Sequence, residues 1–145
     1  MFIVTVAAED DMSGCLIGFA SQCSIDPFLF LVCLSNKNRT FEVAQRSEYM
    51  AVHVVPAEQW ELARLFGAMT GDDLDKFARC AWSAGPGGVP VLELCPSWFA
   101  GPIIERIDAG DHAIHVLQPS AGQGHAGVMP LMFQRARQID AGHEA

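Results

Sequence analysis

The sequence predicts a mainly β domain with short helices, built as a closed or split antiparallel barrel. Six or seven segments have the residue pattern of β-strands, and only a few short helical patterns fall between them. No strand–helix–strand unit repeats along the chain, which argues against a doubly wound parallel sheet. The 145 residues, half of them hydrophobic, are enough for one domain with a substantial core.

Composition excludes several partners and locations. With nine Lys and Arg residues and a formal charge of −8, the chain would repel nucleic acid rather than neutralise its phosphates. The longest clear apolar run, residues 28–34, is too short to span a membrane, and the start lacks the features of a secretory signal. We therefore expect a cytoplasmic protein. The high apolar content also predicts surface that a second copy covers, as in a homo-oligomer.

Two hairpins are predicted at the start of the chain. Residues 2–7 are β-branched and apolar, and a charged turn with Gly14 separates them from a second strand at residues 15–22. A tight turn at residues 24–27 then leads into the apolar strand of residues 28–34. Because a core strand begins at the second residue, we also expect that a short N-terminal helix is absent or was lost through a wrongly chosen start codon.

A helix and a strand follow. The polar loop at residues 35–39 opens a helix over residues 39–48, capped by Asn36 or Asn38. Residues 50–55 alternate as a strand does. His53 lies within this strand and is expected to be a hydrogen-bonded structural histidine rather than a catalyst.

Two further helices and a turn are predicted next. Pro56 begins a helix over residues 57–68, and a second, short helix over residues 72–78 starts with the capping acids Asp72 and Asp73. Residues 84–90 are rich in Gly and Pro. They are interpreted as a turn, because they lack the Lys-Ser/Thr pair of a phosphate-binding P-loop.

The last part of the sequence predicts three strands and a tail. The strands cover residues 91–93, 98–107 and 112–117, with prolines that suit edge strands or bulges. A Gly/Ser/Ala-rich segment follows and reads as a linker, and an apolar cluster lies in the tail beyond it. We therefore divide the chain into a barrel domain, residues 1–119, and a C-terminal linker and tail, residues 120–145, that packs on the barrel or on a dimer partner.

The sequence predicts no catalytic site built from side chains alone. His112 and His115 are three residues apart in a predicted strand, so they point to opposite faces and are not expected to share a metal ion. The five cysteines form no CxxC pair and are interpreted as small buried hydrophobes. No serine lies in a nucleophile-elbow pattern. Redox chemistry would therefore need an organic cofactor. Residues 14–40 offer backbone amides for the polar edge of such a cofactor's ring and for a phosphate.

Several short motifs follow one another in a specific order. They are VTVA (4–7), Gly14, QCSIDP (22–27), LVCL (31–34), NRT (38–40), AVHV (51–54), LARLFG (62–67), DKFA (75–78), GGVPVL (87–92), GDH (110–112) and PLMF (130–133). Together they resemble the flavin reductase domain family, the reductase components of two-component monooxygenases, whose fold is the FMN-binding split β-barrel. The resemblance spans nearly the whole chain.

This resemblance implies an NAD(P)H-dependent flavin reductase. It would be a homodimer that binds FMN or FAD at the subunit interface, takes a hydride from NADH or NADPH, and supplies reduced flavin to a flavin-dependent monooxygenase. By position, the residues that would contact the flavin ring are Leu16, Ile17, Gly18, Phe19 and Ala20, with Gln22 and Cys23 beside it. The phosphate end would be held by Lys37, Asn38, Arg39 and Thr40. His112 matches the family's Gly-Asp-His histidine near the expected nicotinamide, and is the expected catalytic residue.

The segment of residues 16–19 departs from this family. Relatives commonly have Thr-Ala-Ser-Ser where this chain has Leu-Ile-Gly-Phe, so hydroxyls are lost and bulk is added. Contacts from the backbone to a ring would survive, because they do not depend on the side chains. Two alternatives therefore stay open: a flavin-binding dimeric protein without reductase turnover, and a degenerate barrel that serves only as a dimeric interaction module.

Overall fold

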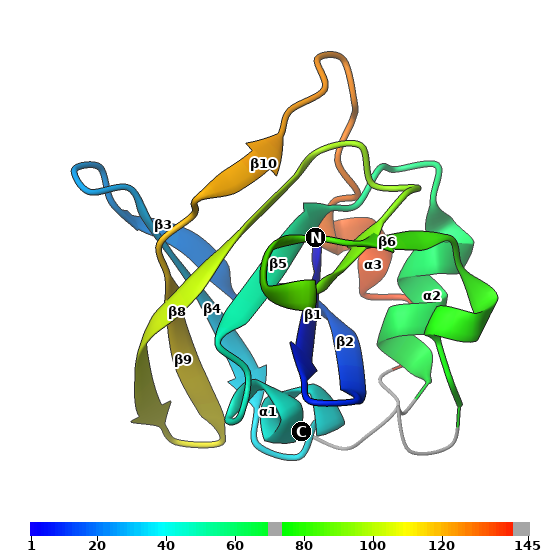
Figure 1. The fold of residues 1–145 in the computed structure, drawn as a ribbon. Helices are drawn as coiled ribbons and strands as arrows, with labels where there is room; N and C mark the ends of the chain where they lie inside the picture. Colours follow the sequence, from blue (N-terminus) through cyan, green and yellow to red (C-terminus); the bar gives the residue numbers. More distant parts are fainter. Residues whose placement is uncertain (70–73, 141–145) are drawn as a thin grey trace.

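An eight-stranded antiparallel sheet curls into a barrel that stays open along one side (Figure 1). The computed structural model describes residues 1–69 and 74–140. In spatial order the strands are β2 (Asp11–Ile17), β1 (Phe2–Ala8), β5 (Tyr49–Val54), β8 (Trp98–Ala109), β9 (His112–Leu117), β4 (Leu29–Ser35) and β3 (Ala20–Ser24), and β10 (Ala121–Gln123) pairs with β8. In the described residues no ladder joins the two end strands, β2 and β3. The mainly β class is confirmed, and the barrel is split rather than closed.

The opening lies where the chain passes from β2 to β3. Ile17 ends β2 opposite Phe2 of β1, whereas Ala20 begins β3 opposite Val32 of β4. The prediction of one continuous strand over residues 15–22 is therefore wrong, because the backbone must leave one partner strand and join another. The two predicted hairpins, β1–β2 and β3–β4, are confirmed.

Gly14 lets helix α2 (Trp60–Ala68) pack against β2. A Cβ at this position would lie 2.9 Å from Phe66 Cε1 and 2.9 Å from the Val4 carbonyl oxygen, closer than real Cβ contacts. The helix starts three residues later than the predicted 57–68. Residues 56–59 instead form a turn, in which the Gln59 N–H donates to the Pro56 carbonyl over 3.0 Å.

The two larger apolar clusters among the described residues hold the fold together. One fills the barrel and consists mainly of Val4, Val6, Ile17, Phe30, Val32, Leu34, Met50, Val52, Ile103 and Leu117. The other lies between the outer face of the sheet and α2. His53 is fully buried between sheet and loop, with Nδ1 3.0 Å from the Ile3 carbonyl and Nε2 accepting from the Leu92 N–H over 3.1 Å. Its predicted structural role is confirmed.

Helix α1 (Arg39–Ala44) covers the lower end of the barrel in Figure 1. Asn38 is its N-cap, and its side-chain oxygen accepts from the Thr40 N–H over 2.9 Å, so one of the two predicted caps is confirmed. The helix ends four residues before the predicted position 48. Val43 and Ala44 turn into the barrel core. Strand β5 lies one residue earlier than predicted.

The segment after α2 forms a small separate sheet. Strands β6 (Trp82–Ala84) and β7 (Pro90–Leu92) pair across the short 3₁₀ turn η2 (Pro86–Gly88). The first two residues of the helix predicted over 72–78 lie outside the described residues, and the only helical element next to its end is the 3₁₀ turn η1 (Phe77–Arg79). No helix in the described ranges is long and apolar enough to cross a membrane.

The tail lies against the barrel. Within the segment predicted as a linker, β10 pairs with β8. Leu131 is fully buried, and its N–H donates to the Val55 carbonyl over 2.7 Å before the short helix α3 (Phe133–Ala136) begins. Strand β8 is longer than the predicted 98–107 and contains a register shift between Ile103 and Glu105 that bends it from one half of the barrel to the other.

Candidate functional site

The first two residues of the predicted ring-binding segment are part of the fold. Ile17 is 7% exposed and belongs to the barrel core. Leu16 is half-buried and packs on the other side of the sheet, where its Cδ2 would be 3.0 Å from a Cβ at Gly67 of α2. Both side chains therefore fill space between layers, which explains how aliphatic residues are tolerated at these two positions.

The next two residues occupy the break between β2 and β3 and are exposed. The Phe19 side chain is 62% exposed, and its ring centroid lies 5.4 Å from that of His112. Its carbonyl accepts from the Cys33 N–H over 2.9 Å, which anchors the backbone to β4. Met1 and Phe133 lie 3.7 Å from the position of a Cβ at Gly18.

Strand β3 carries the remaining ring-binding candidates. Ala20 is half-buried, and Gln22 and Cys23 are exposed. Because β3 is an end strand of the sheet, it presents one row of backbone groups away from β4. The expectation of a buried thiol is wrong for Cys23, whereas Cys15 and Cys95 are buried. Burial raises the pKa of Cys15 to about 11 and that of Cys95 to about 12, which makes both thiols unreactive.

His112 lies at the start of β9 with a carboxylate as its partner. Its Nδ1 is 2.7 Å from Asp111 Oδ1, and its side chain is 24% exposed. The hydrogen bond and the charge of the imidazole lower the pKa of Asp111, and the nearby Lys37 acts in the same direction. Asn36 bonds the same turn from the loop after β4. We call Phe19, Asn36, Asp111 and His112 the rim.

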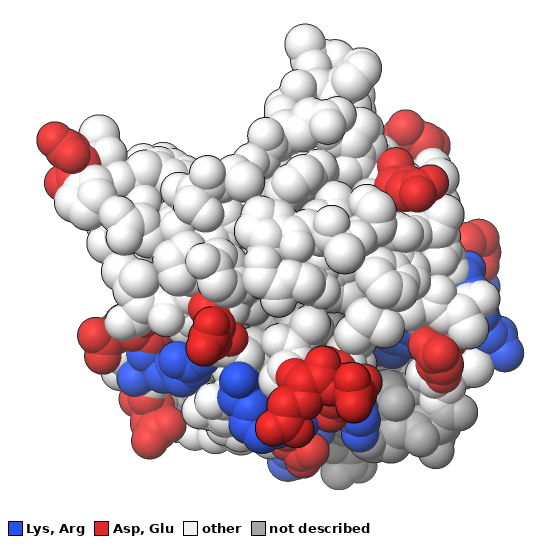
Figure 2. All heavy atoms as spheres, viewed as in Figure 1, with Lys and Arg blue, Asp and Glu red and all other residues white. Residues whose placement is uncertain are grey.

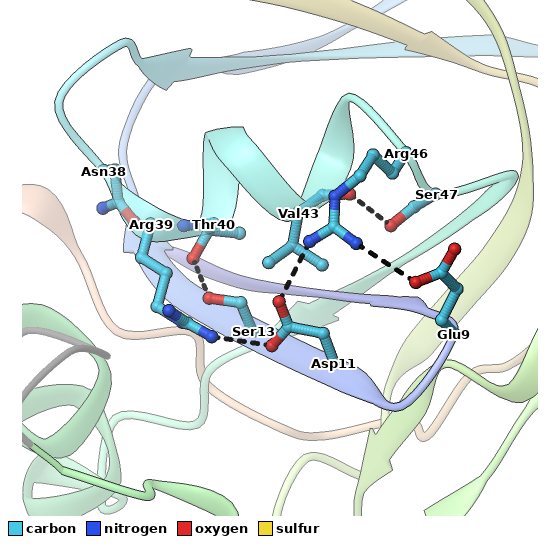
Figure 3. A network of polar contacts seen from close by, with 9 residues as sticks. All are labelled: Glu9, Asp11, Ser13, Asn38, Arg39, Thr40, Val43, Arg46 and Ser47. Atoms are coloured by element: carbon cyan, nitrogen blue, oxygen red, sulfur yellow. Dashed lines mark hydrogen bonds and ion pairs between the residues drawn. The ribbon is translucent and has the colours of Figure 1, made fainter.

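The predicted phosphate loop is largely engaged in the fold (Figure 3). Thr40 is 1% exposed, and its hydroxyl lies 3.0 Å from that of Ser13. Arg39 forms a 2.7 Å ion pair with Asp11, whose second oxygen lies 3.0 Å from Arg46 Nη2. These five residues, Asp11, Ser13, Arg39, Thr40 and Arg46, are called the α1 corner. They connect α1 to β2, and Lys37 of the same loop is exposed beside the rim.

A cavity of about 360 Å³ adjoins the α1 corner. Arg39 and Asp11 line it together with Lys76, which is 6% exposed. The Lys76 Nζ donates to the carbonyls of Gly14, over 3.1 Å, and Phe66, over 3.4 Å, and burial lowers its pKa. Lys76 thus connects the segment that follows α2 to β2 and to α2 itself.

Charge is unevenly spread over the face shown in Figure 2. Lys, Arg, Asp and Glu gather in a band over the end that carries α1, while the hollowed area between β10 and the β3–β4 hairpin shows none. Phe28 of the hairpin turn and Ile104 of β8 are 42% and 47% exposed. The rings of Phe28 and Phe30 contact Phe99 at centroid distances of 6.4 and 5.0 Å.

The arrangement suits positioning rather than acid–base or metal chemistry. Within the described ranges, no three His, Cys, Asp or Glu side chains come together as a metal site. His115 is fully buried while His112 lies at the rim, so the prediction that they point to opposite faces is confirmed. Sequence reasoning singled out His112 and Phe19 as site residues, whereas Asn36 is predicted only as a possible helix cap; its contact joins two loops 74 residues apart.

Comparison with known proteins places the chain among flavin-handling relatives. Residues 1–142 match the family model described as flavin reductase like domain. The chain is 32% identical over 136 residues to a probable flavin reductase of Rhizobium meliloti (strain 1021), covering 91% of this chain and 42% of that protein. It is also 32% identical over 115 residues to the FMN reductase (NADH) RutF of Bradyrhizobium diazoefficiens, covering 77% and 63%.

Solved structures agree with the sequence matches. The FMN-binding protein from Thermus thermophilus with bound 1-cyclohex-2-enone superimposes with a TM-score of 0.80 and 26% identity, covering 94% of this chain and 74% of that one. Other relatives are named as reductase components or subunits of flavin-dependent monooxygenases. The chain spans about half the length of the first curated relatives that it matches, 42% and 50%.

Proposed function

Because this chain belongs to the flavin reductase like domain family, we propose that it is an NAD(P)H-dependent flavin reductase. It would transfer a hydride from NADH or NADPH to FMN or FAD and supply the reduced flavin to a partner monooxygenase. The observation that carries this proposal is the match over residues 1–142, together with a rim that joins Phe19 of the ring-binding segment to His112 of the Gly-Asp-His motif.

The residues at the break between β2 and β3 fit a flavin ring. Gly18 has no side chain, Phe19 is exposed, and the outer edge of β3 offers backbone groups for the polar edge of the ring. Bound flavin supplies the redox chemistry, which is hydride acceptance from the nicotinamide. The tasks of this chain are to align the two rings and to exclude water between them.

The phosphate end fits the exposed part of the loop better than its buried part. Lys37 is exposed on the side of the rim, whereas the Thr40 hydroxyl is buried against Ser13. A phosphate at this loop would meet the charge of Lys37 and the backbone around Asn38, whose side-chain oxygen caps α1. Side-chain contact by Thr40 would require breaking its bond to Ser13.

Contact with the nicotinamide is the role that we propose for His112. Asp111 fixes the Nδ1 side of the imidazole, so the Nε2 edge is the part of the ring left to meet a ligand. Orientation of the hydride donor is the role we assign to it, and we expect the His112→Ala variant to slow flavin reduction more than it weakens flavin binding.

A homodimer and a monooxygenase partner are parts of the same proposal. The uncharged hollow between β10 and the β3–β4 hairpin is a surface that a second copy would cover, and Phe28 in the turn of that hairpin is exposed (Figure 2). The monooxygenase partner rests on the relatives named as reductase components.

One observation favours the alternative of flavin binding without turnover. The Phe19 ring lies against His112, in the space that a nicotinamide would need for stacking. If this ring does not move aside, flavin would bind without being reduced. The interaction-module reading predicts instead a colourless protein whose melting temperature is unchanged by flavin.

A single assay separates the three readings. Purified protein is mixed with FMN or FAD and with NADH or NADPH, and nicotinamide absorbance is followed alongside a flavin fluorescence titration. Oxidation above the no-enzyme rate supports the reductase. Saturable flavin binding without oxidation supports the alternative, and neither effect supports the interaction module.

A further inference from the structure

Asn36 joins the predicted phosphate loop to the turn that carries His112. Its backbone N–H donates to the Asp111 carbonyl over 2.9 Å, and its side-chain Nδ2 donates to the Gly110 carbonyl over 3.0 Å. Ser35, the preceding residue, is paired with His112 in the β4–β9 ladder. Three consecutive residues of the turn are thus held by two consecutive residues at the end of β4.

The Asp111–His112 pair joins an exposed carboxylate to a half-buried imidazole. The Asp111 side chain is 74% exposed, yet its Oδ1 lies 2.7 Å from His112 Nδ1. Because packing does not restrict the rotamers of an exposed side chain, this hydrogen bond persists only where the backbone of the turn holds the two groups within reach of each other. The backbone at this turn is fixed from outside by Asn36, next to Gly110 with its left-handed φ of 82°.

We propose that Asn36 is a positioning residue that holds the Asp111–His112 pair in place beside the flavin-binding loop. This inference rests on the proposed function, since it assigns Asn36 to the orientation of the hydride donor. Lys37 follows Asn36 directly, so a flavin phosphate at the loop and the imidazole at the rim are positioned by one short segment. Asn36 touches neither reacting ring and acts through His112.

The Asn36→Ala variant is the test, because it removes the side-chain donor and leaves the backbone bond. Its matched control is Gln45→Ala, an exposed amide at the C-cap of α1, outside the rim. We expect Asn36→Ala to slow single-turnover flavin reduction about tenfold while the flavin Kd changes less than twofold. Gln45→Ala should change neither quantity. A loss of binding equal to the loss of rate would overturn the proposal.

A double-mutant cycle separates positioning from a general structural role. If Asn36 acts through the imidazole, Asn36→Ala should have less than a twofold effect on the rate when His112 is already alanine. Independent, multiplying effects of the two substitutions would show that Asn36 works in another way. Melting temperatures of all variants establish whether each is folded.

A second measurement does not depend on turnover. In ¹⁵N-labelled wild-type protein at pH 8, the bond to Asp111 should keep His112 in the single tautomer with the proton on Nδ1, and Asn36→Ala should give a mixture. An unchanged tautomer in the variant would overturn the positioning role. If the wild-type protein reduces neither FMN nor FAD, the proposed function fails, and this spectrum still decides the role of Asn36.

Discussion

The α1 corner and the rim each contain residues that are predicted to bind a ligand, yet the fold uses them differently. In the corner, Thr40 bonds Ser13 and Arg39 pairs with Asp11, and all four side chains are at least two-thirds removed from solvent. At the rim, Phe19 is 62% exposed, and the His112 ring bonds Asp111 through Nδ1. Polar residues in a loop therefore do not by themselves mark a ligand site, because the same groups can already be satisfied within the protein.

The corner continues inward to His115, three residues from His112 on β9. Its ring is fully buried, meets Phe41 of α1 edge-on at 6.4 Å, and neither nitrogen has a hydrogen-bond partner in the described part of the chain. Arg106 on β8 donates to the carbonyls of Ala44 and Ser47 nearby. The histidine at position 115 of β9 is thus a buried packing residue, whereas the histidine at position 112 faces outward.

Acidification should produce the largest effect on stability, and it should act through the buried His115. Burial lowers the pKa of His115 to about 4, and the charge of Arg106 acts in the same direction. In the unfolded chain His115 binds a proton below a pH of about 6.5, whereas in the folded chain it stays neutral until the pH falls to about 4. The free energy of unfolding therefore falls as the pH is lowered from about 6.5 to about 4. One such group accounts for about 3 kcal/mol.

The His115→Leu variant isolates this contribution. Unfolding free energies from urea titrations at pH 7.5 and 4.5 should differ less in the variant than in the wild type, by about 2–3 kcal/mol. His53, whose pKa burial lowers to about 4, stays in both proteins and serves as the internal reference. If the free energies of unfolding of the two proteins depend on pH in the same way, His115 is already protonated in the folded state at pH 4.5.

Substitution of Thr40 should have the next largest effect. Thr40→Val leaves the buried Ser13 hydroxyl without its 3.0 Å partner, which costs about 1–3 kcal/mol. Adding Ser13→Ala should restore part of this loss, because both polar groups are then absent. Thermal unfolding measures the change, and Ser21→Ala, an exposed hydroxyl, is the control. If Thr40→Val leaves stability unchanged but weakens flavin binding, the Thr40 side chain contacts the flavin phosphate rather than stabilising the fold.

Local patterns predicted the strands, the hairpins, the Asn38 cap and the buried role of His53. They failed where the outcome depends on distant partners. Residues 15–22 read as one strand, but Ile17 and Ala20 pair with different strands, and nothing local records this change. Arg39 and Thr40 are predicted to hold a phosphate, and nothing local in the sequence records that their side chains contact Asp11 and Ser13 of an earlier strand. Asn36 is predicted only as a possible helix cap, because its bond to Gly110 joins residues far apart in the sequence.

Substitutions of Lys37 and Arg39, two cationic residues of one loop, should have smaller effects that differ from each other in flavin affinity. Lys37→Ala should raise the flavin Kd about tenfold, which corresponds to the loss of a charged hydrogen bond. Arg39→Ala should raise it no more than about threefold and should cost less than about 1 kcal/mol of stability, because its partly exposed ion pair with Asp11 is weak. Flavin fluorescence titration and thermal unfolding measure both variants. A larger binding loss in Arg39→Ala would make the corner part of the phosphate site.

The smallest effect on stability should come from Phe19→Ser, which replaces the aromatic ring with a small hydroxyl side chain. The ring is exposed and outside the core, so its removal should change the unfolding free energy by less than about 0.5 kcal/mol. The same change removes the 5.4 Å contact with His112 and opens the space beside the imidazole. If Phe19 obstructs the nicotinamide, the rate of flavin reduction rises while the melting temperature stays constant. Phe19→Leu keeps an apolar side chain without the aromatic face and is the matched variant. A rate that falls with Ser and with Leu would instead make Phe19 a stacking partner of the bound rings, and the rim would then act through a side chain that the family does not share.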